Sequence, residues 1–179
     1  MPRTTALVAL LLLGVAAQAC GQASDTAGGA KPTADSPWLK YDATTKTVTF
    51  ALTAGVPGGG GPFNFNGYTS GTAALVVPAG SKVVINFVNE DGTPHSAVVT
   101  RGDEPLPSGG GDAAIPGAYS RDATQGLAQG GKDVLRFTAP ASGSYRIICG
   151  VPGHALSGMW IWLRIDPAAK AATFGPTKQ

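Results

Sequence analysis

The sequence has few charged residues and very few of the side chains that bind metal ions. Of its 179 residues only 13% are charged, and 13 Lys and Arg nearly balance 11 Asp and Glu. So low a charge content excludes a coiled coil or a charged helical bundle. The near-neutral balance gives no electrostatic reason to expect a nucleic-acid partner. Only two His, two Cys and two Met occur, which excludes any site that needs many histidines.

Glycine and proline, by contrast, are abundant, with 26 Gly and 14 Pro. From Lys46 onward, apolar and polar residues alternate with period two between turn signals such as Asp91-Gly92. Short alternating segments between turns are typical of strands. The sequence therefore predicts an all-β fold, a Greek-key β-sandwich of about eight strands. We expect these strands within residues 46–52, 63–68, 73–77, 81–88, 96–100, 132–138, 144–149 and 159–165.

The N-terminus has the pattern of an export signal. Arg3 precedes an uncharged, mostly apolar run over residues 6–17, which is too short for a bilayer-spanning helix but suits a signal peptide. Ala17-Gln18-Ala19 then fits cleavage after Ala19. A cysteine in the next position, Cys20, favours a bacterial lipoprotein whose N-terminal cysteine is acylated, and a soluble exported protein is the alternative. Both interpretations predict a periplasmic or otherwise extracytoplasmic domain.

These features divide the chain into four parts. We expect a signal peptide at 1–19, a flexible tether at 20–40, the folded domain at 41–168 and a C-terminal tail at 169–179. We also expect a monomer. Within the domain, the stretch 101–131 is long and rich in Gly, Pro and Asp, so it is either a functional loop or an insertion with little order.

The rare ligand residues gather in one motif. Cys149, His154 and Met159 form a C-x4-H-x4-M run, and His95 lies upstream at the predicted start of a strand. One thiolate, two imidazoles and one weak thioether are the ligands of a type 1 (blue) copper centre. The thiolate binds Cu(II) covalently, whereas the poor thioether donor favours Cu(I). Apart from the residues of the processed end, every His, Cys and Met of the chain belongs to this set.

Each of these residues alone has an ordinary interpretation. A buried cysteine is often a small hydrophobe, and Met159 shares a strand face with Ile161 and Leu163. Zinc is the main metal alternative, but a structural zinc site needs four strong donors and a thioether is not one. A disulfide is available only through Cys20, on the tether. The combination therefore predicts one copper ion.

The same residues resemble the cupredoxin family. The spacing of Cys-Gly-Val-Pro-Gly-His…Gly-Met is similar to the sulfocyanin and rusticyanin branch, as are residues 65–68 and 75–80. The resemblance covers about residues 46–166 and implies one-electron transfer, with His95, Cys149, His154 and Met159 as copper ligands. Many cupredoxins carry Asn after the first histidine ligand. This chain has Ser96, which we expect to alter hydrogen bonding at the thiolate.

The residue counts also limit the function. Multicopper oxidases and copper nitrite reductases need further histidines, and a binuclear CuA site needs a cysteine pair in one loop. We therefore expect an electron carrier and no catalytic turnover. A periplasmic copper carrier or storage module and an immunoglobulin-like adhesion domain are the alternatives.

An apolar surface is expected around His154. Val151, Pro152, Ala155 and Leu156 flank it in the sequence. We expect a redox partner protein, such as a cytochrome, oxidase or reductase, to dock there.

Overall fold

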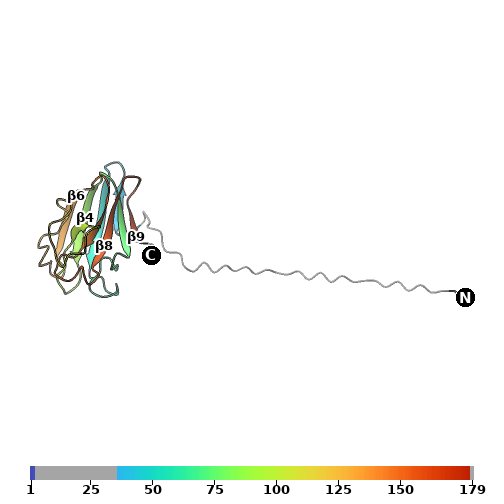
Figure 1. The fold of residues 1–179 in the computed structure, drawn as a ribbon, viewed down its shortest axis with the longest axis horizontal. Coiled ribbons are helices and arrows are strands. Elements are labelled where there is room, and N and C mark those ends of the chain that lie inside the picture. Colours follow the sequence, from blue (N-terminus) through green and yellow to red (C-terminus); the bar gives the residue numbers. More distant parts are fainter. Residues whose placement is uncertain (3–35, 178–179) are drawn as a thin grey trace.

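The computed structural model describes residues 1–2 and 36–177. Most of the predicted signal peptide and tether, including Cys20, lies outside the described residues. Residues 36–177 form nine β-strands and no helix, and no described segment is a helix long and apolar enough to cross a membrane. Figure 1 shows these strands as one sandwich. The predicted all-β fold is confirmed.

Two sheets make up the sandwich. The four-stranded sheet has the order β1 (Leu39–Asp42), β2 (Thr47–Ala54), β4 (Lys82–Asn89), β6 (Lys132–Thr138). The five-stranded sheet has the order β5 (Val98–Arg101), β7 (Gly143–Ile148), β8 (Trp160–Asp166), β3 (Ala73–Pro78), β9 (Thr173–Pro176). Strand β2 is parallel to β4, and β3 is parallel to β8, whereas the other pairs are antiparallel.

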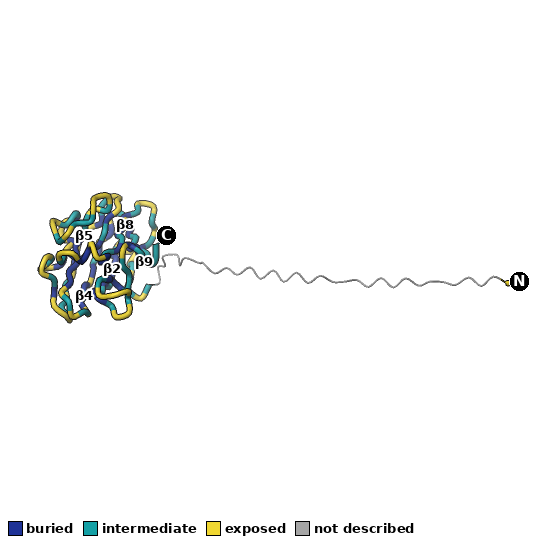
Figure 2. Tube along the Cα trace, turned by 60° about the horizontal axis from the view of Figure 1, so that its bottom comes forward, coloured by how far each residue is buried: buried dark blue, intermediate teal, exposed yellow. Residues whose placement is uncertain are grey.

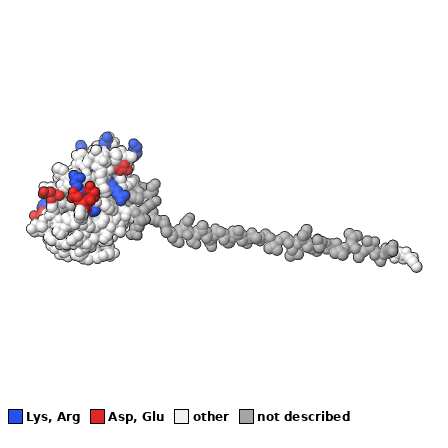
Figure 3. All heavy atoms as spheres, in the orientation of Figure 1, with Lys and Arg blue, Asp and Glu red and all other residues white. Residues whose placement is uncertain are grey.

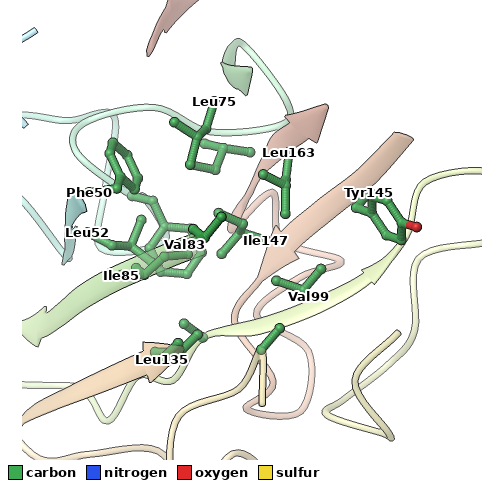
Figure 4. Close-up of a cluster of buried hydrophobic side chains, with 14 of the residues drawn as sticks. Phe50, Leu52, Leu75, Val83, Ile85, Val99, Leu135, Tyr145, Ile147 and Leu163 are labelled. Carbon is green, nitrogen blue, oxygen red and sulfur yellow. The ribbon is translucent and has the colours of Figure 1, made fainter. Parts of the chain in front are cut away.

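The core lies between the two sheets because the strands alternate buried and less buried residues. In β2, every second residue from Val48 to Ala54 is fully buried, and the residues between them are partly exposed. Figure 2 shows this alternation along the chain, and Figure 4 shows the side chains that fill the interior. Each buried Val, Leu, Ile or Phe contributes roughly 1.5–3 kcal/mol to stability. The labelled core residues are Phe50, Leu52, Leu75, Val83, Ile85, Val99, Leu135, Tyr145, Ile147 and Leu163.

Two strands lie in ranges where the sequence predicts none. Strand β1 begins inside the range expected as tether, and β9 lies within the range expected as C-terminal tail. Phe174 of β9 is buried, and its ring centroid lies 4.7 Å from that of Phe50 and 5.8 Å from that of Trp38. The folded domain thus extends to β9. Residues 63–68, expected as a strand, form only isolated bridges of Phe65.

The connection 101–131 packs partly into the main core, through Ile115, Ala118 and Leu127, and partly over the outer face of the five-stranded sheet. Val98 and Ile148, on the outer face of β5 and β7, are fully buried beneath it, in contact with Leu106, Ala113 and Ala123. This second small core explains why a loop rich in Gly and Pro keeps one conformation. Of the two interpretations given above, this packing favours the functional loop.

Arg146 of β7 fastens the start of this connection. Its guanidinium donates hydrogen bonds to the backbone carbonyls of Arg101, Gly102 and Glu104 at 2.7–3.1 Å. The same group lies over the rings of Trp160 and Trp162, at 5.4 and 5.3 Å from their centroids. The two tryptophans therefore pack beneath a cation on the outer face of β8.

Candidate metal centre

His95 lies in the connection between β4 and β5, held by its backbone. Its N–H donates to the carbonyl of Leu127 at 3.1 Å, and the N–H of Leu127 donates back at 2.7 Å. The side-chain amide of Asn89, at the end of β4, donates to the carbonyls of Thr93 and Leu127. Gly126 passes so close that a Cβ there would lie 2.8 Å from the His95 nitrogen, and its φ of +76° favours glycine.

Cys149, His154 and Met159 come from the loop between β7 and β8. The N–H of Cys149 donates to the carbonyl of Met159 at 3.1 Å, which extends the β7–β8 register by one pair. The N–H of Met159 then donates to the carbonyl of His154 at 3.0 Å. These bonds close the loop and place His154 and Met159 beside the strand end that carries Cys149.

The structure brings three of the four predicted donors together. Cys149 Sγ lies 3.8 Å from His95 Nδ1 and 3.4 Å from His154 Nδ1. All three donor atoms lie within 4.8 Å of one another, and all three residues are buried. A metal in the plane of two imidazole nitrogens and a thiolate, at bond lengths of about 2.0 and 2.3 Å, requires N···S separations of about 3.7 Å. The cluster therefore fits one metal ion.

The backbone of Met159, the fourth predicted donor, lies beside that of Cys149, and coordination by its thioether stays a prediction. Its side chain is fully buried in the core cluster that also contains Cys149. Its backbone pairs directly with that of Cys149. A thioether at this place suits the weak axial position of a type 1 copper site.

Burial keeps the free donors uncharged. Desolvation lowers the pKa of His95 to about 4 and also lowers the pKa of His154. Desolvation raises the pKa of the Cys149 thiol, and hydrogen bonds from the amides of Ser96 and Val151 oppose that rise. Neutral imidazoles have free nitrogen lone pairs, whereas a buried thiolate needs a nearby cation. Both conditions suit a bound metal ion.

Ser96 connects three segments of the site. Its N–H donates to Cys149 Sγ at 3.4 Å. Its hydroxyl donates to the carbonyl of Ala123 at 2.6 Å and accepts from the N–H of Gly150 at 2.9 Å. Because the one hydroxyl proton goes to Ala123, the sulfur, 3.9 Å from the hydroxyl oxygen, receives its hydrogen bond from the amide. Ser96 thus orients the cysteine and ties the ligand loop to the connection 101–131.

Phe63 is a site residue that the sequence analysis missed. Its ring centroid lies 4.6 Å from that of His154 and 6.4 Å from that of His95. Phe63 follows a Gly/Pro-rich stretch and has no ligating group, so nothing in the sequence indicates that it lies at a metal site. An aromatic ring against both imidazoles shields them from water and limits their rotation.

Asp91 is the second missed residue, which the sequence analysis took only as a turn signal. Its Oδ1 lies 3.8 Å from His95 Nε2, longer than a hydrogen bond, and its side chain is 23% exposed. That buried Nε2 has no hydrogen-bond partner among the described residues. A hydrogen bond from the N–H of Thr93 lowers the pKa of Asp91, so a carboxylate faces the imidazole.

The surface beside His154 agrees with the sequence analysis in part. Leu156 is 60% exposed, Pro152 is exposed and Val151 is partly exposed. Ala155, predicted to belong to this surface, is 1% exposed because it packs against Val98 and Ile148. We call Val151, Pro152 and Leu156 the His154 patch.

A two-sheet β-sandwich with a buried Cys-His-His cluster at one end and a methionine paired to the cysteine defines a cupredoxin. The model of the sulfocyanin (SoxE) domain family matches residues 34–171. The chain belongs to the sulfocyanin family. Fold, family and donor cluster together support the predicted cofactor, one copper ion at a type 1 site.

Individual relatives agree with this placement. Sulfocyanin of Sulfolobus acidocaldarius is 34% identical over 127 residues, which cover 67% of this chain and 64% of that protein. Rusticyanin of Acidithiobacillus ferrooxidans is 31% identical over 121 residues, which cover 64% and 74%. A solved structure of rusticyanin, described as a copper protein, has a TM-score of 0.51 at 25% identity and covers 72% of this chain and 87% of that one. The match thus spans a little less than two thirds of the curated sulfocyanin.

Replacing Asp91 tests the influence of its charge on the copper site. A carboxylate near His95 stabilises Cu(II) more than Cu(I), because Cu(II) carries the larger charge. We expect Asp91→Asn to raise the reduction potential by tens of millivolts, on the order of 1 kcal/mol. Potentiometric titration measures the shift, and Glu90→Gln, an exposed neighbour in the same turn, is the matched control. An unchanged or lowered potential in Asp91→Asn, or an equal rise in the control, would contradict this role.

Proposed function

We propose that the protein is a mononuclear type 1 copper electron carrier, with His95, Cys149, His154 and Met159 as the copper ligands. The observation that carries the proposal is the convergence of both imidazole Nδ1 atoms on Cys149 Sγ, at 3.8 and 3.4 Å, in a buried site. Copper bound there supplies a Cu(II)/Cu(I) couple that accepts and releases one electron. The chain fixes the donors and excludes water.

The donors are held so that little moves when the charge changes. His95 is fixed through Leu127, Cys149 through Met159 and Ser96, and His154 by the ring of Phe63. Fixed donors in a dry site keep the reorganisation of ligands and solvent small. Such rigidity favours rapid electron transfer in both directions.

The proposal includes no catalytic turnover. Both histidines of the chain lie in the one cluster, so none is left to bind a second copper centre for oxygen or nitrite. The alternative of a copper carrier or storage module is less favourable because His95 and Cys149 are fully buried. Handing a metal ion to a partner requires ligands that the partner can reach.

Optical and EPR spectra of the protein with stoichiometric Cu(II) test the ligand set. Thiolate coordination in a trigonal site should give intense visible charge-transfer absorption and a small copper hyperfine splitting. Cys149→Ser should abolish both, whereas Ser157→Ala, an exposed position in the same loop, should keep them. A colourless protein with ordinary tetragonal copper, unchanged in Cys149→Ser, would refute the electron-carrier proposal and favour a copper carrier.

We further propose that a redox partner protein docks on the His154 patch. An uncharged surface allows brief docking with little dependence on salt. On the face drawn in Figure 3 the charged side chains gather in groups, so the few charges of the chain are not spread evenly. Val151, Pro152 and Leu156 carry no charge. His154 is 9% exposed beside this patch, so it gives the shortest route from the cluster to a docked partner.

Electron exchange between oxidised and reduced copies of the protein tests this patch. Leu156→Glu puts a charge at its centre, where two approaching copies would repel each other and retain water. We expect the bimolecular rate constant to fall by about tenfold or more, with the visible spectrum unchanged. Val134→Glu, which places the same charge on exposed β6, should change the rate by less than about twofold. Equal effects of the two substitutions would exclude docking at the His154 patch.

For location, we propose that the domain functions outside the cytoplasm, attached to the membrane through lipid on Cys20. The support is the sequence pattern of residues 1–20 alone. Expressed in a bacterium, the wild-type chain should fractionate with membranes, and Cys20→Ser should be released in soluble form. Mass spectrometry of the mature N-terminus should show an acylated Cys20. A soluble, unmodified wild-type protein would favour simple secretion.

A further inference from the structure

The outer face of the four-stranded sheet is strongly basic. Alternation along β1, β2, β4 and β6 points one set of residues outward, and this set includes four cations and one acid. The acid, Asp42, accepts hydrogen bonds from the amides of Thr44 and Thr45 in its own turn. We call this surface the basic face; its cations are Lys40, Lys82, Lys132 and Arg136.

The cations of the basic face have no acidic partners. The ion pairs among the described residues are His95–Asp91, Arg101–Glu104 and Arg121–Asp133, and none includes a cation of this face. Lys82 lies opposite Thr138 and Arg136 opposite Val84, so the two cations are diagonal neighbours on adjacent strands. Two like charges at such a short distance on a sheet repel each other. An external anion would relieve that repulsion.

A shallow hollow lies between these two cations. Its volume is ≈ 460 Å³, and it is lined by Thr47, Lys82, Val83, Val84, Arg136, Phe137 and Thr138. Two cations with two threonine hydroxyls can bind a phosphate group through charge and hydrogen bonds. The hollow is open, and the remaining cations spread over a sheet about 14 Å wide from β1 to β6. This width suits an extended anionic surface better than a single small anion.

We propose that the basic face binds the phosphate headgroups of an anionic lipid membrane. Basic residues close to anionic lipid each strengthen binding substantially, and the attraction falls off within a Debye length. The face lies on a flat side of the sandwich, whereas the metal centre lies at the end where β4 and β7 finish. A molecule resting on this face therefore keeps the His154 patch free for a partner. This membrane contact rests on the proposed electron carrier and gives it a defined orientation on the membrane surface.

Binding of residues 36–177, which contain all nine strands and the whole described core, to lipid vesicles tests the proposal. We expect binding to vesicles of phosphatidylcholine with phosphatidylglycerol, loss of binding at high salt, and none to phosphatidylcholine alone. Lys82→Gln/Arg136→Gln should weaken binding by more than about tenfold. The matched control Arg101→Gln/Arg164→Gln removes two cations of the five-stranded sheet and should change it by less than about twofold.

The copper absorption band reports folding of the two double-substitution variants, and its loss in Cys149→Ser concerns the electron-carrier proposal alone. Lipid binding by Cys149→Ser should equal that of the wild type. No binding to anionic vesicles, or equal weakening by the two double substitutions, would overturn the membrane proposal. Competition by low concentrations of inorganic phosphate would also overturn it, because the hollow would then be a site for a free anion.

Discussion

The structure depends on holding a thiol and two imidazoles against one another out of water. Desolvation lowers the pKa of both histidines and raises that of Cys149, which favours their neutral forms, and the buried His95 Nε2 has no hydrogen-bond partner among the described residues. Burying such groups costs free energy. A cation recovers part of that cost by stabilising the thiolate, and the surrounding core must supply the rest. The site can therefore form only in a domain whose core packing is stable enough to bury these groups.

The connection 101–131 contributes much of the packing around the site. It contacts both ligand segments through its backbone groups: Leu127 pairs with His95, the carbonyl of Ala123 accepts from the Ser96 hydroxyl, and the N–H of Gly110 donates to the carbonyl of Gly150. Close approach at Gly150, where a Cβ would lie 2.6 Å from the Ala123 carbonyl oxygen, explains the need for glycine. The connection thus packs against the ligand loop, and it is itself held by Ile115, Ala118 and Leu127 in the main core and by the small core above Val98 and Ile148.

Strands and site residues are predictable from the sequence where the signal is local. Alternation located β2, β4, β6, β7 and β8 because each buries one face along at least six residues. Counting rare residues identified the cluster because His, Cys and Met have few other uses in this chain. Strand β9, of sequence Thr-Phe-Gly-Pro, has no alternation to detect, and it is held by pairing with β3 and by packing of Phe174 against Phe50.

Two residues of the site are not predictable from the sequence for the same reason, which is that their signal is not local. Asp91 and Phe63 act on the histidines through space, across turns whose geometry no local pattern specifies. In the sequence, Asp91 is typical of a turn and Phe63 of a short buried strand, so neither residue indicates that it lies beside a histidine ligand. The order of 101–131 was equally hidden, because it arises from contacts between residues that lie far apart in the chain.

The two proposed surfaces differ in a way that suits their tasks. A carrier must leave each partner quickly, and the small, uncharged His154 patch provides little area to hold one. Staying near a membrane requires a weak but lasting attraction, which spread cations can provide without any fixed geometry. Because the basic face lies on the side of the sandwich and the patch at its end, salt should weaken the contact of the basic face with the membrane and leave docking nearly unchanged. Substitutions in the basic face should then change the orientation on the membrane, and substitutions in the His154 patch should change electron transfer.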